Sequence, residues 1–494
     1  MPLPSFSLAP DQVWQPLPLN EWNESAVRHL LSRLGWTATP AETARTLKEG
    51  PVAAMRRYFA RLPAFSMPPL VAKIEEEAPE LARQVARGDE GEKRQARRIV
   101  RERFREGLFE LTLHWLQQAA KPENAPAEKW LLFLQDVWVV GAEKVRNPAL
   151  LYQYQELLRA GALRNYPLLA KALSRSPAMV QYLDLQQNKA SAPNENFARE
   201  LFELFTLGEG NYTENDIKEA ARAFTGYRQQ LGKFAFQRRQ HDSGRKTIFG
   251  RTGAFTGDDV IDLVFQQKAA GSFMVREMAR FYLTEHPLPD TYANDLGAWW
   301  AKQDYNLGKL VVAFFTSRLF YAPEFRANFI KSPIQYYLGL MQDLALTPPP
   351  LPRRAIASLR QMGQTPFNPP NVRGWVGGKS WINSATLAAR RATANALLSP
   401  VPEALLNGDE RAALRAAGDI GDFTVRPARF AEWAKLPTAE CAHVLVSLAL
   451  PRRTHDTRLL ASVAELIDDS SQRRDFTLRA VLATLLESPD YQLC

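Results

Sequence analysis

Apolar residues recur at helical spacing along most of this chain, and one helix carries a concentrated polar stripe. Its apolar face is formed by Phe197, Leu201, Leu204 and Phe205. The neighbouring face carries Asn196, Arg199, Glu200 and Glu203. Positions three and four residues apart lie on one side of an α-helix, so this segment predicts an amphipathic helix. The polar stripe is either a solvated face or a polar cluster in a functional cleft, and spacing alone leaves both open.

Helix start and stop signals punctuate the rest of the chain. Thr39 and Pro40 begin one helix and Gly50 marks its end, because proline fits the first helical turn and glycine favours the end. Thr213 and Asp216 form the capping pair of another helix. Further helices are expected at 24–35, 52–61, 128–142, 148–159 and 165–174. The sequence therefore predicts a mainly α fold with a large, multi-helix globular body.

The segment 70–107 is densely charged. Its arginines recur at helical spacing: Arg94, Arg97, Arg98, Arg101 and Arg105. An acidic group precedes them: Glu75, Glu76, Glu77 and Glu80. This pattern predicts a charged helix or a helical pair. A solvated face is the ordinary explanation of the arginine stripe, and a phosphate-binding strip is the alternative, which no aromatic interleaving supports.

Three stretches break the helical pattern. Residues 228–256 predict a small β-hairpin or an extended flap, because 233–237 alternate weakly and 247–249 are apolar. Residues 348–352 form a proline-rich, stiff connector, and 365–378 are irregular. We expect a main helical domain over 1–400 and a C-terminal helical segment over 401–494, packed on the same body.

Composition limits the classes of protein that remain. At 494 residues, with 46% hydrophobic and 23% charged residues, the chain has the balance of an ordinary globular protein. Cys441 and Cys494 offer neither a zinc spacing nor a disulfide framework. A net charge of +9 is modest for this length, so nucleic acid is not an expected partner. No transmembrane segment and no secretory signal is evident, which predicts a cytoplasmic protein as written, or a periplasmic or envelope protein if the sequence is trimmed.

His241 and Asp242 are the most chemically suggestive pair. An imidazole can transfer protons or bind a metal near neutral pH, and a carboxylate can orient it. The pair lies in a glycine-containing loop with Arg245 and Lys246, which are candidates for holding a ligand. Adjacent residues do not normally bond to each other as a catalytic dyad, so a turn held by Asp242 is an equal alternative.

Glu200 and Glu203 could supply two oxygen ligands, with His241 completing a mixed site if the flap folds over their helix. The alternative is a salt-bridge network with Arg199 and Arg222. Together with Asp242, these two glutamates and His241 are the catalytic candidates. We expect no bound cofactor and no tightly held transition metal.

A second candidate surface is the loop around two tryptophans, Trp375 and Trp381. Its prolines and glycines suit either a rigid loop that lines a cleft or a buried structural plug. Arg373 and Lys379 could hold an anionic ligand there. The remaining ligand-binding candidates are Arg373, Trp375 and Trp381 of this loop, with Asn196 and Arg199 of the polar stripe. The glycines lack the strand-loop-helix arrangement of a nucleotide-binding motif.

Three long blocks carry a resemblance to a known family. They are NENFARELFELFTLG with YTENDIKEAARAFTGY, HDSGRKTIFG, and FNPPNVRGWVGGKSWINSATLAARR. In this order they resemble the bacterial family of domain of unknown function 1800. The resemblance implies a helical fold and a bacterial source, with no established reaction. It also implies a partner, because members are often encoded beside sulfatase-like proteins of domain of unknown function 1501.

The chain departs from the family in one helix. Relatives tend to have an aromatic-Trp-His-Asn-His-like run, whereas the equivalent here contains His114, Leu116 and Gln118. Leu116 and Gln118 would stand where histidines stand elsewhere, and neither is a good transition-metal ligand.

These observations favour an accessory or binding protein acting with a sulfatase-like partner. We expect the signature helix, the flap and the tryptophan loop to meet at one polar cleft. The alternative is a metal-dependent hydrolase or oxidoreductase that uses Glu200, Glu203, His241 and Asp242.

Overall fold

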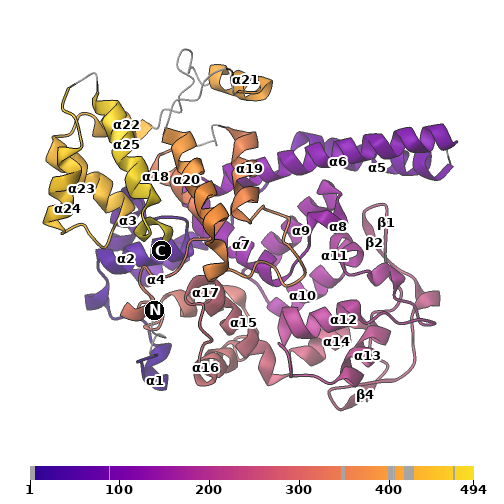
Figure 1. Cartoon of the computed structure of the whole chain (residues 1–494). Coiled ribbons are helices and arrows are strands. Elements are labelled where there is room, and N and C mark those ends of the chain that lie inside the picture. The colour runs from indigo at the N-terminus through magenta and orange to yellow at the C-terminus, as the bar shows by residue number, and fades with distance from the viewer. Residues whose placement is uncertain are drawn as a thin grey trace.

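The expected mainly α fold is confirmed by a computed structural model, which describes residues 6–87, 89–346, 351–398, 404, 406–416, 428–470 and 473–494. Helices make up most of the chain, and the described strands form two small antiparallel hairpins (Figure 1). Residues 348–350 of the proline-rich connector and the expected domain boundary near residue 400 lie outside the described residues. One large apolar core contains the fully buried rings of Trp36, Trp115, Trp130, Trp138 and Trp300.

Short helices open the chain. They are α1 Pro10–Val13, η1 Leu19–Glu21, α2 Glu24–Leu34, α3 Pro40–Glu49 and α4 Pro51–Tyr58. Pro40 occupies the first turn of α3, as its position after Thr39 predicts. Gly50 separates α3 from α4 with a φ of 79°, a conformation that favours glycine.

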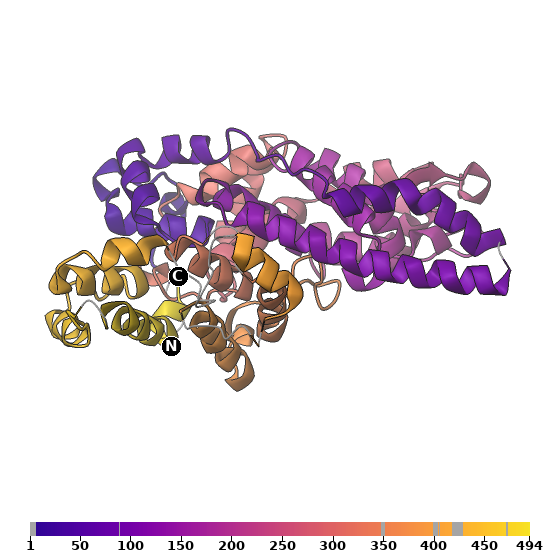
Figure 2. The ribbon, with the colours of Figure 1, turned by 90° about the horizontal axis from the view of Figure 1, so that it is seen from above.

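The charged segment is a helical pair. Helices α5 Pro69–Arg87 and α6 Glu90–Ala119 pack against each other as an antiparallel hairpin. The hairpin runs along the body and ends in a free tip, as both ribbon views show (Figures 1 and 2). Asp89 and Glu92 form a reciprocal capping box at the start of α6.

The central layer follows the hairpin. It comprises η2 Pro122–Asn124, α7 Ala125–Val137, α8 Ala142–Val145, α9 Pro148–Gly161, α10 Tyr166–Ser174, α11 Pro177–Tyr182 and η3 Leu185–Gln187. The helix expected over 128–142 ends at Val137. Trp138 leaves the helical conformation, and its buried indole donates to Tyr166 Oη at 2.7 Å. Burial of this large ring outweighs continuation of the helix.

The signature segment is not one regular α-helix. Helix α12 Asn196–Glu200 passes directly into η4 Leu201–Thr206, which is a π-helix. Leu207 N donates to the carbonyl of Phe202 at 2.9 Å, a bond that spans five residues. A period of 3.6 residues therefore describes only the first part of the polar stripe. Single π-turns inside helices are frequent at functional sites.

The flap consists of two hairpins. Its elements, with the flanking helices, are α13 Glu214–Ala223, β1 Tyr227–Gln230, β2 Lys233–Phe236, η5 Arg238–Gln240, β3 Lys246–Ile248, β4 Arg251–Gly253 and α14 Gly257–Val264. Tyr227 pairs with Phe236, and Lys246 with Gly253. Both hairpins turn through a residue followed by glycine, Leu231-Gly232 and Phe249-Gly250, and all four residues have positive φ. Two consecutive positive φ values are the signature of the tight hairpin turn.

The next part of the chain contains α15 Lys268–Tyr282, α16 Asp290–Ala301, α17 Leu307–Phe315, η6 Pro323–Phe325 and α18 Pro333–Asp343. Helices α15 and α16 cross where each has a glycine. A Cβ atom on Gly271 would lie 2.5 Å from the carbonyl oxygen of Gly297. Only two glycines allow the backbones of α15 and α16 to approach this closely.

The C-terminal part is also helical. Its described elements are α19 Pro352–Met362, η7 Gly378–Trp381, α20 Ser384–Leu398, α21 Gly408–Ala416, α22 Ala428–Trp433, α23 Thr438–Ala449, α24 Thr457–Glu465, α25 Arg474–Glu487 and η9 Asp490–Gln492. Helix α25 packs on α20. Buried Arg390 of α20 donates to the Lys331 carbonyl (2.7 Å) and to Gln492 Oε1 (3.2 Å), which ties the last residues to the body. Among the described residues no helix is long and apolar enough to cross a membrane.

Candidate functional site

An open groove of about 1420 Å³ lies where α15, α16, the π-helix η4 and the tryptophan loop meet. Glu203 and Glu209 come from the signature segment, and Arg373 and Trp375 come from the third family block. The groove therefore joins two blocks that are far apart in the sequence. Its volume exceeds the roughly 300 to 1000 Å³ of a typical small-molecule pocket.

Arg373 links the tryptophan loop to the π-helix. Its Nη2 donates to Glu203 Oε1 at 2.7 Å and to Glu209 Oε1 at 3.1 Å. The second oxygen of Glu203 accepts from Tyr212 Oη at 2.9 Å. The side chain of Glu203 is 16% exposed and that of Arg373 is 61% exposed. Glu203 is thus a fixed acceptor in the groove, and Arg373 is a cation at its rim.

A buried carboxylate holds the other end of the loop. Asp136, at the end of α7, accepts from Arg280 Nη2 at 2.9 Å and from the main-chain N–H of Trp375 at 2.9 Å. Arg280 also donates to Glu277 at 2.8 Å. Burial alone lowers the pKa of Arg280, but Asp136 and Glu277 outweigh burial and raise the pKa. The side chain of Asp136 is 2% exposed, so this pairing offsets the cost of burying its charge.

Both tryptophans of the loop are buried. Trp375 is 5% exposed and Trp381 is 8% exposed. Trp375 lines the groove, whereas the carbonyl of Trp381 accepts from Thr386 Oγ1 at the start of α20. Between them Val376 is 80% exposed at the groove rim. The loop thus presents Arg373 and Val376 outward while the two rings anchor it.

Glu200 lies next to this groove. It is half-buried, and no hydrogen-bond partner is found for it within the described parts of the chain. Burial first, and the charge of Glu203 second, raise the pKa of Glu200. Tyr182 lies nearby, since burial and the charge of Glu200 raise the pKa of its hydroxyl to about 12. Tyr182 lines a separate cavity of about 330 Å³ beside Asn371.

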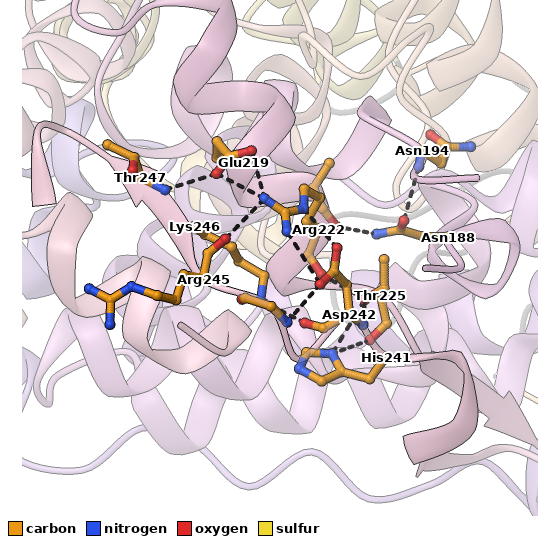
Figure 3. Close-up of polar contacts among 12 residues, drawn as sticks. Asn188, Asn194, Glu219, Arg222, Thr225, His241, Asp242, Arg245, Lys246 and Thr247 are labelled. Carbon is orange, nitrogen blue, oxygen red and sulfur yellow. Dashed lines mark hydrogen bonds and ion pairs between the residues drawn. The ribbon is translucent and has the colours of Figure 1, made fainter. Parts of the chain in front are cut away.

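His241 and Asp242 belong to a different cluster, shown in Figure 3. The His241 Nδ1 lies 2.9 Å from the Thr225 carbonyl oxygen. A carbonyl oxygen only accepts, so Nδ1 carries the hydrogen and Nε2 of the neutral ring keeps a lone pair. Asp242 does not orient this ring, because its carboxylate accepts from Arg222 Nε (2.7 Å) and from the Gly244 N–H (2.8 Å).

Arg222 organises this second cluster. Its hydrogen bond to Asp242 holds the pKa of that carboxyl below its usual value. The same guanidinium donates to Glu219 at 2.8 Å, and to the carbonyl of Arg245 at 3.2 Å. Buried Lys246 donates to the carbonyls of Asp242 (2.6 Å) and Gly244 (2.9 Å), and burial lowers its pKa. These contacts hold a turn, which was the alternative to catalysis for this pair.

The remaining residues of the polar stripe bond locally. Arg199 donates through both terminal nitrogens to Glu214 (2.8 Å each), and to Glu195 at 3.1 Å. Asn196 donates to the carbonyl of Leu183 at 3.3 Å. The structure therefore brings Glu203, Arg373 and Trp375 together in the groove. It places Asn196, Arg199, His241, Asp242, Arg245, Lys246 and Trp381 outside the groove lining.

Sequence reasoning missed Asp136 and Arg280, which fix the groove wall. The two residues are 144 positions apart, so no local spacing links them. One signal was available, because Asp136 interrupts the apolar run WLLFLQDVWVV. A lone carboxylate inside an apolar helix is rarely buried without a partner.

The last turns of α6, where the sequence suggests a departure from the family, pack against the core. Leu116 is fully buried, and Gln118 donates to the carbonyl of Ala64 at 3.0 Å. His114 lies 3.3 Å from Ser66 Oγ through its Nε2. Across the described ranges no group of three or more His, Cys, Asp or Glu side chains is arranged to hold a metal ion.

Comparison with known proteins identifies a family. No curated protein and no solved structure was found to match the chain. The family described as Protein of unknown function (DUF1800) matches residues 29–493, which is nearly the whole chain and includes all three blocks. Because the match spans far more than half of the sequence, the chain belongs to the DUF1800 family.

Proposed function

We propose that this chain is an accessory binding protein that holds an extended ligand in its groove and acts with a sulfatase-like partner of domain of unknown function 1501 type. One observation carries the proposal. The two family blocks that are farthest apart meet through the Arg373–Glu203 ion pair at the groove of about 1420 Å³. A surface assembled in this way suits recognition of a ligand longer than a metabolite.

The charged side chains in the groove suit ligand binding better than catalysis. Glu203, Asp136 and Glu277 are each held by an arginine within 3 Å. Carboxylates committed to arginines are poor proton donors and poor nucleophiles, but they are well-ordered hydrogen-bond acceptors. The groove is thus preorganised for contacts with a ligand.

Co-purification tests the partner. The chain and a sulfatase-like protein encoded in the same genome would be mixed and separated by size-exclusion chromatography. We expect the two proteins to form a complex. Hydrogen exchange at 203–209 and 371–376 should slow when the complex binds a ligand in the groove. Separate elution of the two proteins at tens of micromolar would refute the partner. Unchanged exchange at both segments would refute the role of the groove.

A hydrolase is the second candidate, and Glu200 favours it. A half-buried carboxyl with a raised pKa beside an arginine-held carboxylate is the arrangement of an acid and its neighbouring base. The metal-dependent enzyme considered from the sequence would also use His241 and Asp242. In the structure His241 contacts Thr225 and Asp242 contacts Arg222, away from Glu200. We expect Glu200→Gln to abolish any hydrolysis of p-nitrophenyl esters or glycosides. Turnover that survives this substitution would remove Glu200 from consideration.

A further inference from the structure

The groove differs in charge from the rest of the molecule. Six carboxylate and five cationic side chains line it, whereas the whole chain has a formal charge of +9. The lining is therefore close to neutral on a basic protein. A groove that bound a polyanion would concentrate positive charge instead.

Eight of the eleven charged side chains that line the groove pair with one another. Arg373 holds Glu203 and Glu209, and Arg280 holds Asp136 and Glu277. Arg276 pairs with Asp290 at 2.8 Å. An anionic ligand would have to compete with these carboxylates for the arginines. A cationic ligand would have to compete with the arginines for the carboxylates. At the buried Asp136–Arg280 pair, such competition would leave an uncompensated charge and cost several kcal/mol.

The paired groups keep spare hydrogen-bonding capacity. Arg373 uses only Nη2 for its two carboxylates, so Nε and Nη1 face no protein acceptor among the described residues. The groove is also lined by neutral amides, among them Gln266 and Asn294. A hydroxyl group both donates and accepts, so one ligand hydroxyl can bridge an arginine N–H and a carboxylate without breaking their pair.

The walls of the groove argue against peptides. Its lining comes from helices, from the short loops that join them and from the tryptophan loop, and residues of β1 to β4 are not part of it. An extended peptide is usually captured by the edge of a strand, and a helical peptide by an apolar groove. Here eleven of the thirty lining residues are charged, so the groove suits neither kind of peptide.

We propose that the ligand held in this groove is a neutral polyhydroxylated polymer, a stretch of uncharged polysaccharide several sugar units long. This inference rests on the proposed binding function of the same groove. Sugar hydroxyls would bond to the Arg373–Glu203 and Arg280–Glu277 pairs. The exposed side chain of Val376 would contact the apolar face of a sugar ring.

Calorimetry with defined oligosaccharides tests the ligand class. The neutral probes are the hexasaccharides of cellulose, amylose, chitin, xylan, mannan and laminarin. The charged probes are hexagalacturonate and a heparin hexasaccharide. We expect at least one neutral probe to bind, with an affinity that changes less than about twofold between low and high salt, because no net ion pair forms. The charged probes should bind weakly or not at all.

A matched pair of variants locates the site. Arg373→Met removes donors at the groove rim, and because Arg373 is 61% exposed the fold should tolerate the change. Loss of hydrogen bonds to a charged donor predicts about a tenfold or larger fall in affinity. Arg199→Met is the control, since Arg199 makes a similar pair with Glu214 outside the groove lining. The control should bind the neutral probe as the unchanged protein does.

Each outcome decides the proposal. Binding of only charged probes, or of none of the neutral ones, would overturn it. Binding that Arg373→Met and Arg199→Met reduce equally would place the sugar elsewhere and also overturn it. Failure here is separable from failure of the proposed function. A protein that binds its sulfatase-like partner, protects 203–209 and ignores every sugar keeps the binding role and loses only the polysaccharide.

Discussion

Gly374 packs so closely on Asp136 that a single methyl group there should disturb the groove wall. Its φ is 74°, and a Cβ atom would lie 2.3 Å from Asp136 Oδ1 and 2.9 Å from the Asp136 carbonyl oxygen. Ordinary carbon contacts need roughly 3.5 Å. In Gly374→Ala the loop would therefore have to move about 1 Å away from Asp136. That movement stretches the hydrogen bond from the Trp375 N–H to the buried carboxylate.

Two effects set the expected loss of stability. A non-glycine residue in the left-handed region costs roughly 1 to 2 kcal/mol. Weakening a hydrogen bond to a buried, charged acceptor costs a further 1 to 3 kcal/mol or so. The free energy of unfolding should therefore fall by about 2 to 5 kcal/mol.

Urea unfolding followed by tryptophan fluorescence measures this change. Gly250→Ala is the control, because Gly250 has a φ of 73° and open space where a Cβ would stand. It should show only the backbone cost of roughly 1 to 2 kcal/mol. If Gly374→Ala lost no more stability than Gly250→Ala, the contact with Asp136 would not be what fixes the loop.

Three further changes probe the same region. Asp136→Asn breaks the buried ion pair with Arg280 and should cost about 3 to 5 kcal/mol in urea unfolding; a loss below about 1 kcal/mol would contradict a buried charge pair. Trp375→Ala and Trp381→Ala should each cost roughly 3 to 5 kcal/mol through lost contacts and a cavity, and unchanged melting of both variants would show exposed rings. The pKa of Glu200 is raised in the folded state, so the folded protein favours the protonated carboxyl. The ionised carboxylate therefore destabilises the folded protein, and this loss of stability develops as the pH rises through the raised pKa. Glu200→Gln should therefore gain stability over the unchanged protein at neutral pH and lose this advantage near pH 4, and a difference that stays constant with pH would contradict it.

Local sequence signals predicted the elements that depend on neighbouring residues. The capping box of Thr213 and Asp216 begins α13, and Pro40 begins α3. Both rest on contacts within about four residues, which spacing in the sequence records directly. Burial of Trp375 agrees with one of the two interpretations that its sequence allowed, because a large aromatic ring gains stability when it packs against the body.

Features that depend on distant contacts could not be predicted. The π-helix η4 requires a bond from Leu207 N to the Phe202 carbonyl, and nothing in the local pattern distinguishes it from an α-helix. His241 and Asp242 look like a functional pair in sequence. Their partners are Arg222, in the last turn of α13, and Thr225, just after that helix, and these two residues hold the pair in a turn. The groove wall depends on Asp136 and Arg280, whose pairing exists only once α7 and α15 have packed together.

The same contacts that hold the tryptophan loop also position its outward-facing side chains. Asp136 fixes the main chain at Trp375, two residues after Arg373, so the place of the rim guanidinium depends on a carboxylate buried behind it. Substitutions at Asp136 should therefore lower stability and ligand affinity together. Arg373 itself is mostly exposed, and its pairs with Glu203 and Glu209 contribute little to stability. A change at Arg373 should consequently alter binding alone, which makes it the position where recognition can be measured separately from folding.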